Sequence, residues 1–434
     1  MLNMFSKKSL ENNKLFKNIL KMVLGTGIAR IIGVASIPIL TRLYTPYDYG
    51  VLAVFVGLIA VISPILSLRY VVAIPLPKKD ESAINLVALS LMLMGCMSVV
   101  IGLIFYFFID VFAQWFDIAV LQDFWWLIIL GAIAVALYEM LSLWATRQQH
   151  YSIIARTKVT QSLIGEGSKI VLGLLAIKPL GLLIGNIFEQ SAGSISFIYK
   201  FKEDFIRLKF HIHKKIFYLL WNYYRGFPLF RLPSQFLLVF SMQAPAFFAA
   251  SLYGATSTGQ LSLALMAMAL PISLIGASVS QVFYGEISNI GKGSEEKIKN
   301  LVIVVQKKLF LVGIPITLFI FFAGEFIFKI AFGNKWIEAG QYASILAPYL
   351  LLQLTSSPLV QVLNVYNAQL SFLAINVFRA IGLVSIYLYC QYFNIEMSDF
   401  VAILSGFLFV FYLLMSVYIL NVVNRKALNR TYLN

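Results

Sequence analysis

The sequence predicts an all-α integral membrane protein in which twelve transmembrane helices form two six-helix halves around a central cavity. Composition, the spacing of apolar runs and the placement of basic residues each point to this class. Of 434 residues, 60% are hydrophobic and only 12% are charged, and the mean hydropathy is +0.84. A soluble domain carries about twice that share of charge. Most of the surface of this chain must therefore face lipid.

Twelve runs approach the length of about 20 residues that a helix needs to cross a bilayer. They fall at roughly 20–41, 49–68, 83–107, 123–146, 159–177, 180–199, 227–250, 257–283, 309–331, 341–365, 369–391 and 399–423. The fifth, sixth and seventh are the least apolar. The lysine-rich start of the chain lacks the features of a cleaved signal peptide, so we expect the first run to remain as a membrane helix.

The basic residues fix the orientation of these helices. With a cytoplasmic N-terminus, 26 of the 34 lysines and arginines fall in cytoplasmic segments and four fall on the opposite face. This asymmetry is a strong positive-inside signal. It predicts a multi-pass protein with both termini in the cytoplasm. It also explains the net charge of +15 without nucleic-acid binding.

A short pattern recurs in the two halves. A Leu-Tyr pair followed by Gly and Leu repeats with an offset of 209 residues, at Leu43, Tyr44, Gly50 and Leu52 and at Leu252, Tyr253, Gly259 and Leu261. Mid-helix cations repeat similarly, at Lys169 and Arg379. We predict an N-terminal half at 1–200, a basic cytoplasmic linker at 201–226 and a C-terminal half at 227–434. Repeats of this kind place a substrate site between the halves.

Several ionisable residues fall inside predicted helices, where each costs about 2.5–3.5 kcal/mol on insertion scales. Such side chains are expected to face the bundle interior or a watery cavity. A cavity lined by the cations would attract an anion, and the planar fork of arginine suits phosphate. The predicted substrate-binding cations are Arg30, Lys169, Arg379 and Arg231.

The two acidic residues and two of the cations leave alternatives open. Glu166 and Lys169 are spaced i,i+3 and could neutralise each other. Arg231 could extend to the membrane interface. Glu189, and Glu166 with it, could couple transport to protons, or Glu189 could pair with a cation. Arg30 and Arg379 have no acidic neighbour on their own helix, which favours a functional role.

Motifs for chemistry are missing from the sequence. Gly165–Lys169 and Gly291–Ser294 lack the residues and spacing of a P-loop. No nucleophile stands near a base, and no spacing suggests a metal or cofactor site. We therefore expect no catalytic residues. The Gly181–Gly185 pair at the start of the sixth run is typical of close helix packing.

Two loops carry a family resemblance. Residues 41–55, TRLYTPYDYGVLAVF, link the first two helices, and residues 69–81, RYVVAIPLPKKDE, link the next two. Both resemble the N-terminal signature of bacterial polysaccharide-biosynthesis membrane proteins, the Wzx-type flippases. These belong to the multidrug/oligosaccharidyl-lipid/polysaccharide exporter superfamily. One departure is visible, because members often have an acidic residue where this chain has Val71.

The resemblance implies transport of an undecaprenyl-diphosphate-linked oligosaccharide from the cytoplasmic to the periplasmic leaflet of the inner membrane. It implies alternating access through a cation-lined cavity, in O-antigen or capsule assembly, with a polysaccharide polymerase and chain-length machinery as partners. The alternatives are a drug antiporter of the same superfamily, a flippase for the peptidoglycan precursor and a polysaccharide polymerase or ligase. An acidic cavity would favour the antiporter, and fourteen helices would favour the flippase for the peptidoglycan precursor. A large periplasmic loop would favour the polymerase or ligase.

Overall fold

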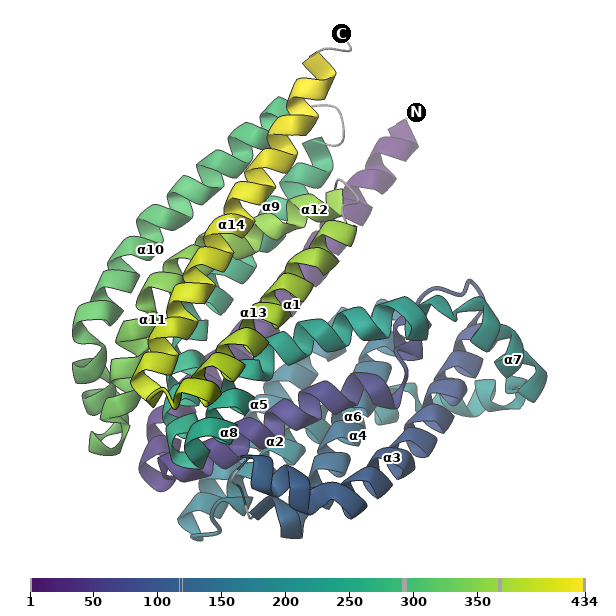
Figure 1. Cartoon of the computed structure of the whole chain (residues 1–434). Helices are drawn as coiled ribbons and strands as arrows, with labels where there is room; N and C mark the ends of the chain where they lie inside the picture. Colours follow the sequence, from purple (N-terminus) through teal and green to yellow (C-terminus); the bar gives the residue numbers. More distant parts are fainter. Residues whose placement is uncertain (1, 117, 119, 291–294, 366–368, 432–434) are drawn as a thin grey trace. The chain divides into compact units, whose positions relative to one another are not determined.

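The computed structural model describes residues 2–116, 118, 120–290, 295–365 and 369–431, and these are nearly all helical (Figure 1). The near-miss motif at 291–294 lies outside them. The described helices are α1 (Leu2–Leu43), α2 (Pro46–Leu66), η1 (Tyr70–Ala73), α3 (Asp80–Phe116), α4 (Val120–Arg147), α5 (Tyr151–Leu174), α6 (Leu180–Leu208), η2 (Lys209–His211), α7 (Lys214–Tyr223), η3 (Phe227–Arg231), α8 (Leu232–Pro271), η4 (Ile272–Gly276), α9 (Ala277–Ile290), α10 (Glu295–Phe332), η5 (Asn334–Trp336), α11 (Ile337–Ser356), η6 (Ser357–Val360), α12 (Gln361–Val365), α13 (Gln369–Phe393) and α14 (Met397–Thr431).

Nine segments of the described chain are long and apolar enough to cross a membrane. They are Leu24–Leu43, Pro46–Leu66, Asp80–Phe116, Val120–Arg147, Phe227–Gly276, Glu295–Phe332, Asn334–Leu363, Leu373–Phe393 and Met397–Arg425. The chain is thus a multi-pass membrane protein. Nine is fewer than the twelve expected windows for two reasons. Helices α5 and α6 are not among the nine, and Phe227–Gly276 holds two windows on either side of a non-helical residue, Gly254 (φ 77°, ψ 178°).

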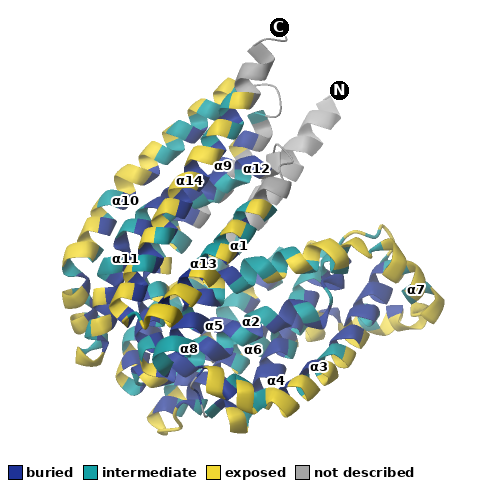
Figure 2. Cartoon of the chain, in the orientation of Figure 1, coloured by how far each residue is buried: buried dark blue, intermediate teal, exposed yellow. Residues whose placement is uncertain are grey.

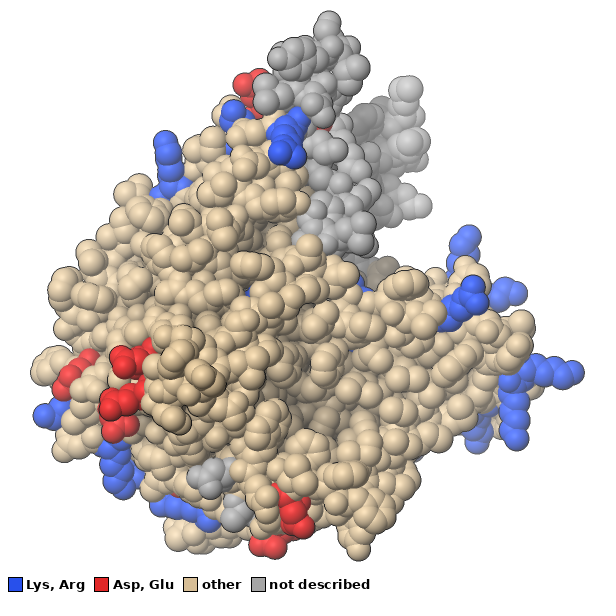
Figure 3. All heavy atoms as spheres, in the orientation of Figure 1, with Lys and Arg blue, Asp and Glu red and all other residues tan. Residues whose placement is uncertain are grey.

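The exposed surface of the helices is apolar, as a lipid-facing surface should be. Figure 2 shows exposed residues running along α3, α10 and α14, and they include Phe107, Phe322 and Val410. In Figure 3, most of the surface visible on that face carries no charged residue. A soluble protein exposes mainly polar side chains to water. Here the exposed side chains of the helices are apolar because lipid surrounds them.

The chain divides into two compact units, Met1–Val239 and Phe240–Asn434. In the first, α5 packs against α1 and α6, and α4 packs against α2, α3 and α6. In the second, α11 packs against α10 and α14, and α13 packs against α14. The division between the units falls within α8, and η3 contacts η1 of the first unit.

Candidate functional site

Three charged side chains meet between α5 and α6. The ammonium of Lys169 lies 3.0 Å from Glu166 Oε1 and 2.7 Å from Glu189 Oε2. Ser36, on α1, donates a hydrogen bond of 2.6 Å to the other oxygen of Glu166. Glu166 and Lys169 are both buried. We call these three charged residues the ion cluster. With both carboxylates ionised, the two negative charges and one positive charge leave the ion cluster with a net negative charge.

Glycines allow the two helices of the ion cluster to approach. A Cβ on Gly165 would lie 2.5 Å from the Cβ of Glu189, and one on Gly185 would lie 2.5 Å from the Cγ of Lys169. A Cβ on Gly181 would lie 2.5 Å from the hydroxyl of Tyr44. The Gly181–Gly185 pair therefore serves close helix packing, as the sequence pattern predicts.

The first signature loop is tied directly to the ion cluster. The Tyr44 hydroxyl donates a 2.8 Å hydrogen bond to the carbonyl oxygen of Lys169. Burial and the nearby Asp48 raise the pKa of Tyr44 to about 12, so this donor stays protonated. Thr45 and Asp48 form a capping box, and Pro46 takes the first position of α2. This local sequence starts α2 immediately after the tyrosine and holds that tyrosine in place.

The second signature loop is held by two arginine–carboxylate pairs. Arg69, in a left-handed conformation (φ 62°), places Nη1 2.8 and 3.0 Å from the two oxygens of Glu139 on α4. Arg147, at the end of α4, donates to Asp80 at 2.8 and 3.0 Å, and to the carbonyl oxygen of Pro77. These contacts fasten the α2–α3 connection to α4.

Glu139 is not among the site residues predicted from the sequence, although its position in an apolar run marks it as unusual. It is the only charged residue in the apolar window 124–146, and such a residue usually has a partner. Val71 is fully buried where family members often carry an acid. In this chain, Glu139 supplies a carboxylate to the same loop from another helix.

The other predicted cations are not part of the ion cluster. Arg30 is partly exposed on α1, and Arg231 is exposed at the end of η3. Arg379, on α13, places its guanidinium carbon 5.8 Å from the ring centre of Phe411 and 6.0 Å from that of Tyr412. Its Nε is buried and has no hydrogen-bond partner in the described part of the chain.

The structure thus brings together three of the six predicted site residues. The ion pair that the i,i+3 spacing of Glu166 and Lys169 allows is present, and Glu189 joins it. No carboxylate among the described residues pairs with Arg30, Arg231 or Arg379. Within the same residues, no group of three His, Cys, Asp or Glu side chains could hold a metal ion.

The fold of this multi-pass helical chain is shared with solved membrane proteins. It is similar to the lipid II flippase MurJ in an inward closed conformation, with 15% identity and a TM-score of 0.70 over 94% of this chain and 87% of that one. It is also similar to an inward-facing multidrug resistance MATE transporter of the MOP superfamily (14% identity, TM-score 0.62, 94% and 95% of the two chains). The MATE transporter VcmN of Vibrio cholerae gives 14% identity and a TM-score of 0.59 over 99% of both chains.

The sequence itself defines the family more closely. A model of the polysaccharide biosynthesis protein family matches residues 39–341, which is more than half of the chain. The chain belongs to this family, and the resemblance carried by residues 41–55 and 69–81 is confirmed. No curated protein matches the sequence.

Proposed function

We propose that this protein is a flippase that moves an undecaprenyl-diphosphate-linked oligosaccharide from the cytoplasmic to the periplasmic leaflet of the bacterial inner membrane. It acts by alternating access in O-antigen or capsule assembly and catalyses no covalent chemistry. Arg30 and Arg379 carry the proposal, because both are helical cations without a carboxylate partner among the described residues. Family membership supports a polysaccharide intermediate as the substrate.

The proposed topology has twelve spans, in two halves around a central cavity, with both termini in the cytoplasm. Helices α5 and α6 count as spans because pairing within the ion cluster reduces the cost of their charges in the bilayer. The segment Phe227–Gly276 counts as two, divided at Gly254. Tyr253 precedes this break as Tyr44 precedes α2, and its hydroxyl donates to the carbonyl oxygen of Ile395 at 2.9 Å. This correspondence supports the internal repeat.

The cations contribute unequally to diphosphate binding in this proposal. Arg30 and Arg379 come first, since no described carboxylate competes with phosphate for them. Lys169 has two carboxylate partners, so phosphate must compete with both of them for its ammonium. Protonation of Glu189 or Glu166 would weaken its pair with Lys169 and so link transport to pH. Arg231 would meet the substrate near the cytoplasmic entrance.

Transport in liposomes tests the proposal. The protein is reconstituted, and movement of a fluorescent undecaprenyl-diphosphate oligosaccharide is measured for wild type, Arg30→Ala and Arg379→Ala. We expect each variant to lose at least about tenfold in rate, since a charged hydrogen bond contributes about 1.5–3 kcal/mol. Arg207→Ala, at an exposed site, is the matched control. Equal rates for all four proteins would remove the arginines from the site, and no transport by wild type with several sugar head groups would refute the flippase.

A cation-coupled drug antiporter is the second candidate. The observation that favours it is the excess of carboxylates in the ion cluster, which would suit a coupling cation or a cationic substrate. Under this alternative, liposomes with an imposed proton gradient would accumulate a lipophilic cationic dye, and Glu189→Gln would abolish the uptake. The flippase proposal predicts no such uptake.

A further inference from the structure

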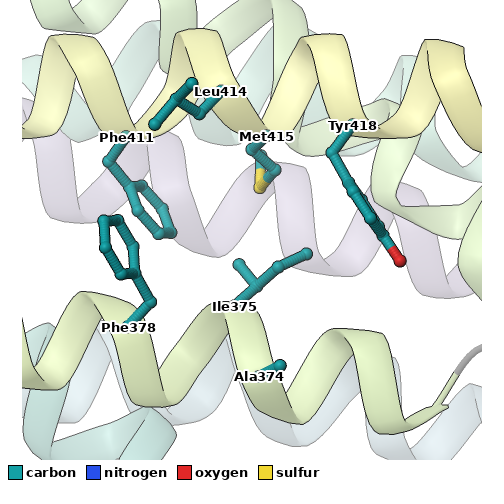
Figure 4. Close-up of a pocket in the computed structure, with 7 residues that line it drawn as sticks. All are labelled: Ala374, Ile375, Phe378, Phe411, Leu414, Met415 and Tyr418. Atoms are coloured by element: carbon teal, nitrogen blue, oxygen red, sulfur yellow. The ribbon is translucent and has the colours of Figure 1, made fainter.

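An apolar cavity lies between α13 and α14 in the second unit. Its volume is about 500 Å³, within the range of sites that hold small ligands. Figure 4 shows the side chains that line it: Ala374, Ile375, Phe378, Phe411, Leu414, Met415 and Tyr418. Tyr418 contributes the only hydroxyl among these side chains. An apolar chain is therefore the kind of group that this cavity can solvate.

The cavity can be reached from the side of the helix pair. Phe378 is 53% exposed, and Leu414 is 51% exposed. Phe378 and Phe411 stack at 6.4 Å with an angle of 14° between their rings, one from each helix. A flexible chain in the surrounding lipid could enter between these side chains without unfolding either helix.

Cations stand at both ends of the cavity. Arg379 follows Phe378 in sequence, and its guanidinium lies over Phe411 with the Nε unpartnered among the described residues. At the other end, Arg425 is exposed and comes seven residues after Tyr418 on α14. Seven residues are two turns, so Arg425 shares the face of α14 that lines the cavity, about 10 Å farther along. A ligand whose apolar chain fills the cavity would therefore have its anionic head beside Arg425.

We infer that the cavity between α13 and α14 binds the polyprenyl chain of the lipid-linked diphosphate while the diphosphate is still in the cytoplasmic leaflet, beside Arg425. This inference rests on the proposed function, which places the end of α14 in the cytoplasm. This cavity lies between one pair of helices, which suits a lipid with one chain, whereas membrane phospholipids carry two. The diphosphate also carries more charge than a phosphodiester, which favours it near an arginine.

Photolabelling of the full-length protein tests the site directly. The probe is undecaprenyl diphosphate without sugar, with a diazirine on its isoprenoid chain, added to protein in nanodiscs. We expect labelled peptides from α13 and α14 around the cavity, and we expect unlabelled undecaprenyl diphosphate to compete while phosphatidylglycerol does not. Equal competition by phosphatidylglycerol would overturn the inference, because the cavity would then hold ordinary membrane lipid.

Two pairs of variants control for changes in folding. Leu414→Trp fills the cavity, whereas Leu413→Trp changes its exposed neighbour, which does not line it. Ile375→Trp and Ile381→Trp form the same comparison on α13. We expect the cavity variant of each pair to lower labelling about tenfold, with no change for its control. Equal labelling within both pairs would overturn the inference.

The transport assay separates this inference from the proposed function. Transport by wild type without labelling of the cavity would leave the flippase intact and refute the polyprenyl site. Labelling of the cavity, competed only by undecaprenyl diphosphate, would establish the site even if wild type failed to transport. That second result would refute the flippase and leave a polyprenyl-diphosphate-binding protein.

Discussion

Lys169 is the residue on which the ion cluster depends. Both carboxylates and the hydroxyl of Tyr44 converge on it, the last through its backbone carbonyl. Removing one carboxylate still leaves the ammonium with a partner. Removing the ammonium leaves the buried carboxylate of Glu166 without its cation and close to the partly exposed Glu189, and an unpaired buried charge is costly.

We therefore expect Lys169→Met to destabilise the protein by about 3 kcal/mol and Glu189→Gln by only about 1 kcal/mol. The measurement is the apparent melting temperature of the purified protein in detergent, with both variants compared with wild type. The double variant Lys169→Met, Glu189→Gln should recover part of the loss, because it removes the facing charges. Equal melting temperatures for the two single variants would contradict this account.

The same residues allow a test of proton coupling. If Glu189 releases Lys169 on protonation, Glu189→Gln should flatten the dependence of transport on pH while transport itself continues. The assay is the liposome measurement repeated across a range of pH. Transport by Glu189→Gln with the pH dependence of wild type would exclude Glu189 as the coupling site.

Helices α5 and α6 pack closely because glycines leave room for the facing helix. A Cβ on Gly165 would meet the Cα of Glu189 at 3.1 Å as well as its side chain, so a larger residue must push the backbones apart. Gly167, two residues later on α5, has nothing within 4 Å of the corresponding position. The two positions form a matched pair on one helix.

We expect Gly165→Val to destabilise the protein by about 3 kcal/mol through overpacking and Gly167→Val to have little effect. Yield and melting temperature of the detergent-purified variants provide the measurement. A similar loss for both variants would show that the contact between α5 and α6 is not the cause of the destabilisation.

Helix α7 is the element that most resembles a membrane-surface helix. None of its side chains is buried, and it presents Tyr218, Leu219 and Tyr223 beside Lys214 and Lys215. Contacts within α7 and just before its first residue anchor the helix. Tyr70 stacks on Trp221 at 5.2 Å, and Asn85 hydrogen-bonds the backbone of His211 and His213. An anchored helix with aromatic and basic side chains suits an anionic leaflet.

We predict that the double variant Lys214→Gln, Lys215→Gln weakens contact of α7 with anionic lipid by about 1 kcal/mol per lysine. Hydrogen exchange of residues 209–224 should then rise in nanodiscs containing phosphatidylglycerol, and match wild type in nanodiscs of phosphatidylcholine alone. Lys329→Gln, predicted on the opposite face, is the control. No difference in phosphatidylglycerol would refute the surface contact.

At the scale of the whole molecule, topology is the property most open to a direct test. Helices α5 and α6 decide between twelve spans and fewer. If both cross the membrane, the connection containing Lys178 is periplasmic, while Lys202 is cytoplasmic. Both side chains are exposed, so a cysteine at either position can react.

We expect Lys178→Cys to react with an impermeant maleimide from outside the inner membrane and Lys202→Cys to react only after the membrane is opened. The background has Cys96 and Cys390 replaced by alanine. Protection of Lys178→Cys in sealed cells would place the α5–α6 connection in the cytoplasm and would refute the twelve-span topology.

Much of this architecture could be read from sequence because the physics involved is local. A helix in lipid satisfies its own backbone hydrogen bonds, so length and hydropathy suffice to find the apolar segments. The capping box at Thr45 and the glycine pair on α6 are likewise local patterns. The family signature rests on contiguous residues as well.

Pairing between distant residues required the tertiary structure. The i,i+3 spacing allowed a contact between Glu166 and Lys169, yet only the packing of α6 on α5 brings Glu189 to the same ammonium. Glu139 meets Arg69 across 70 positions in the chain. The sequence by itself determined that the chain is a multi-pass helical membrane protein with costly charges in its helices. Tertiary structure decided which of those charges are neutralised, because ion pairs act over a few ångströms and such distances follow from helix packing.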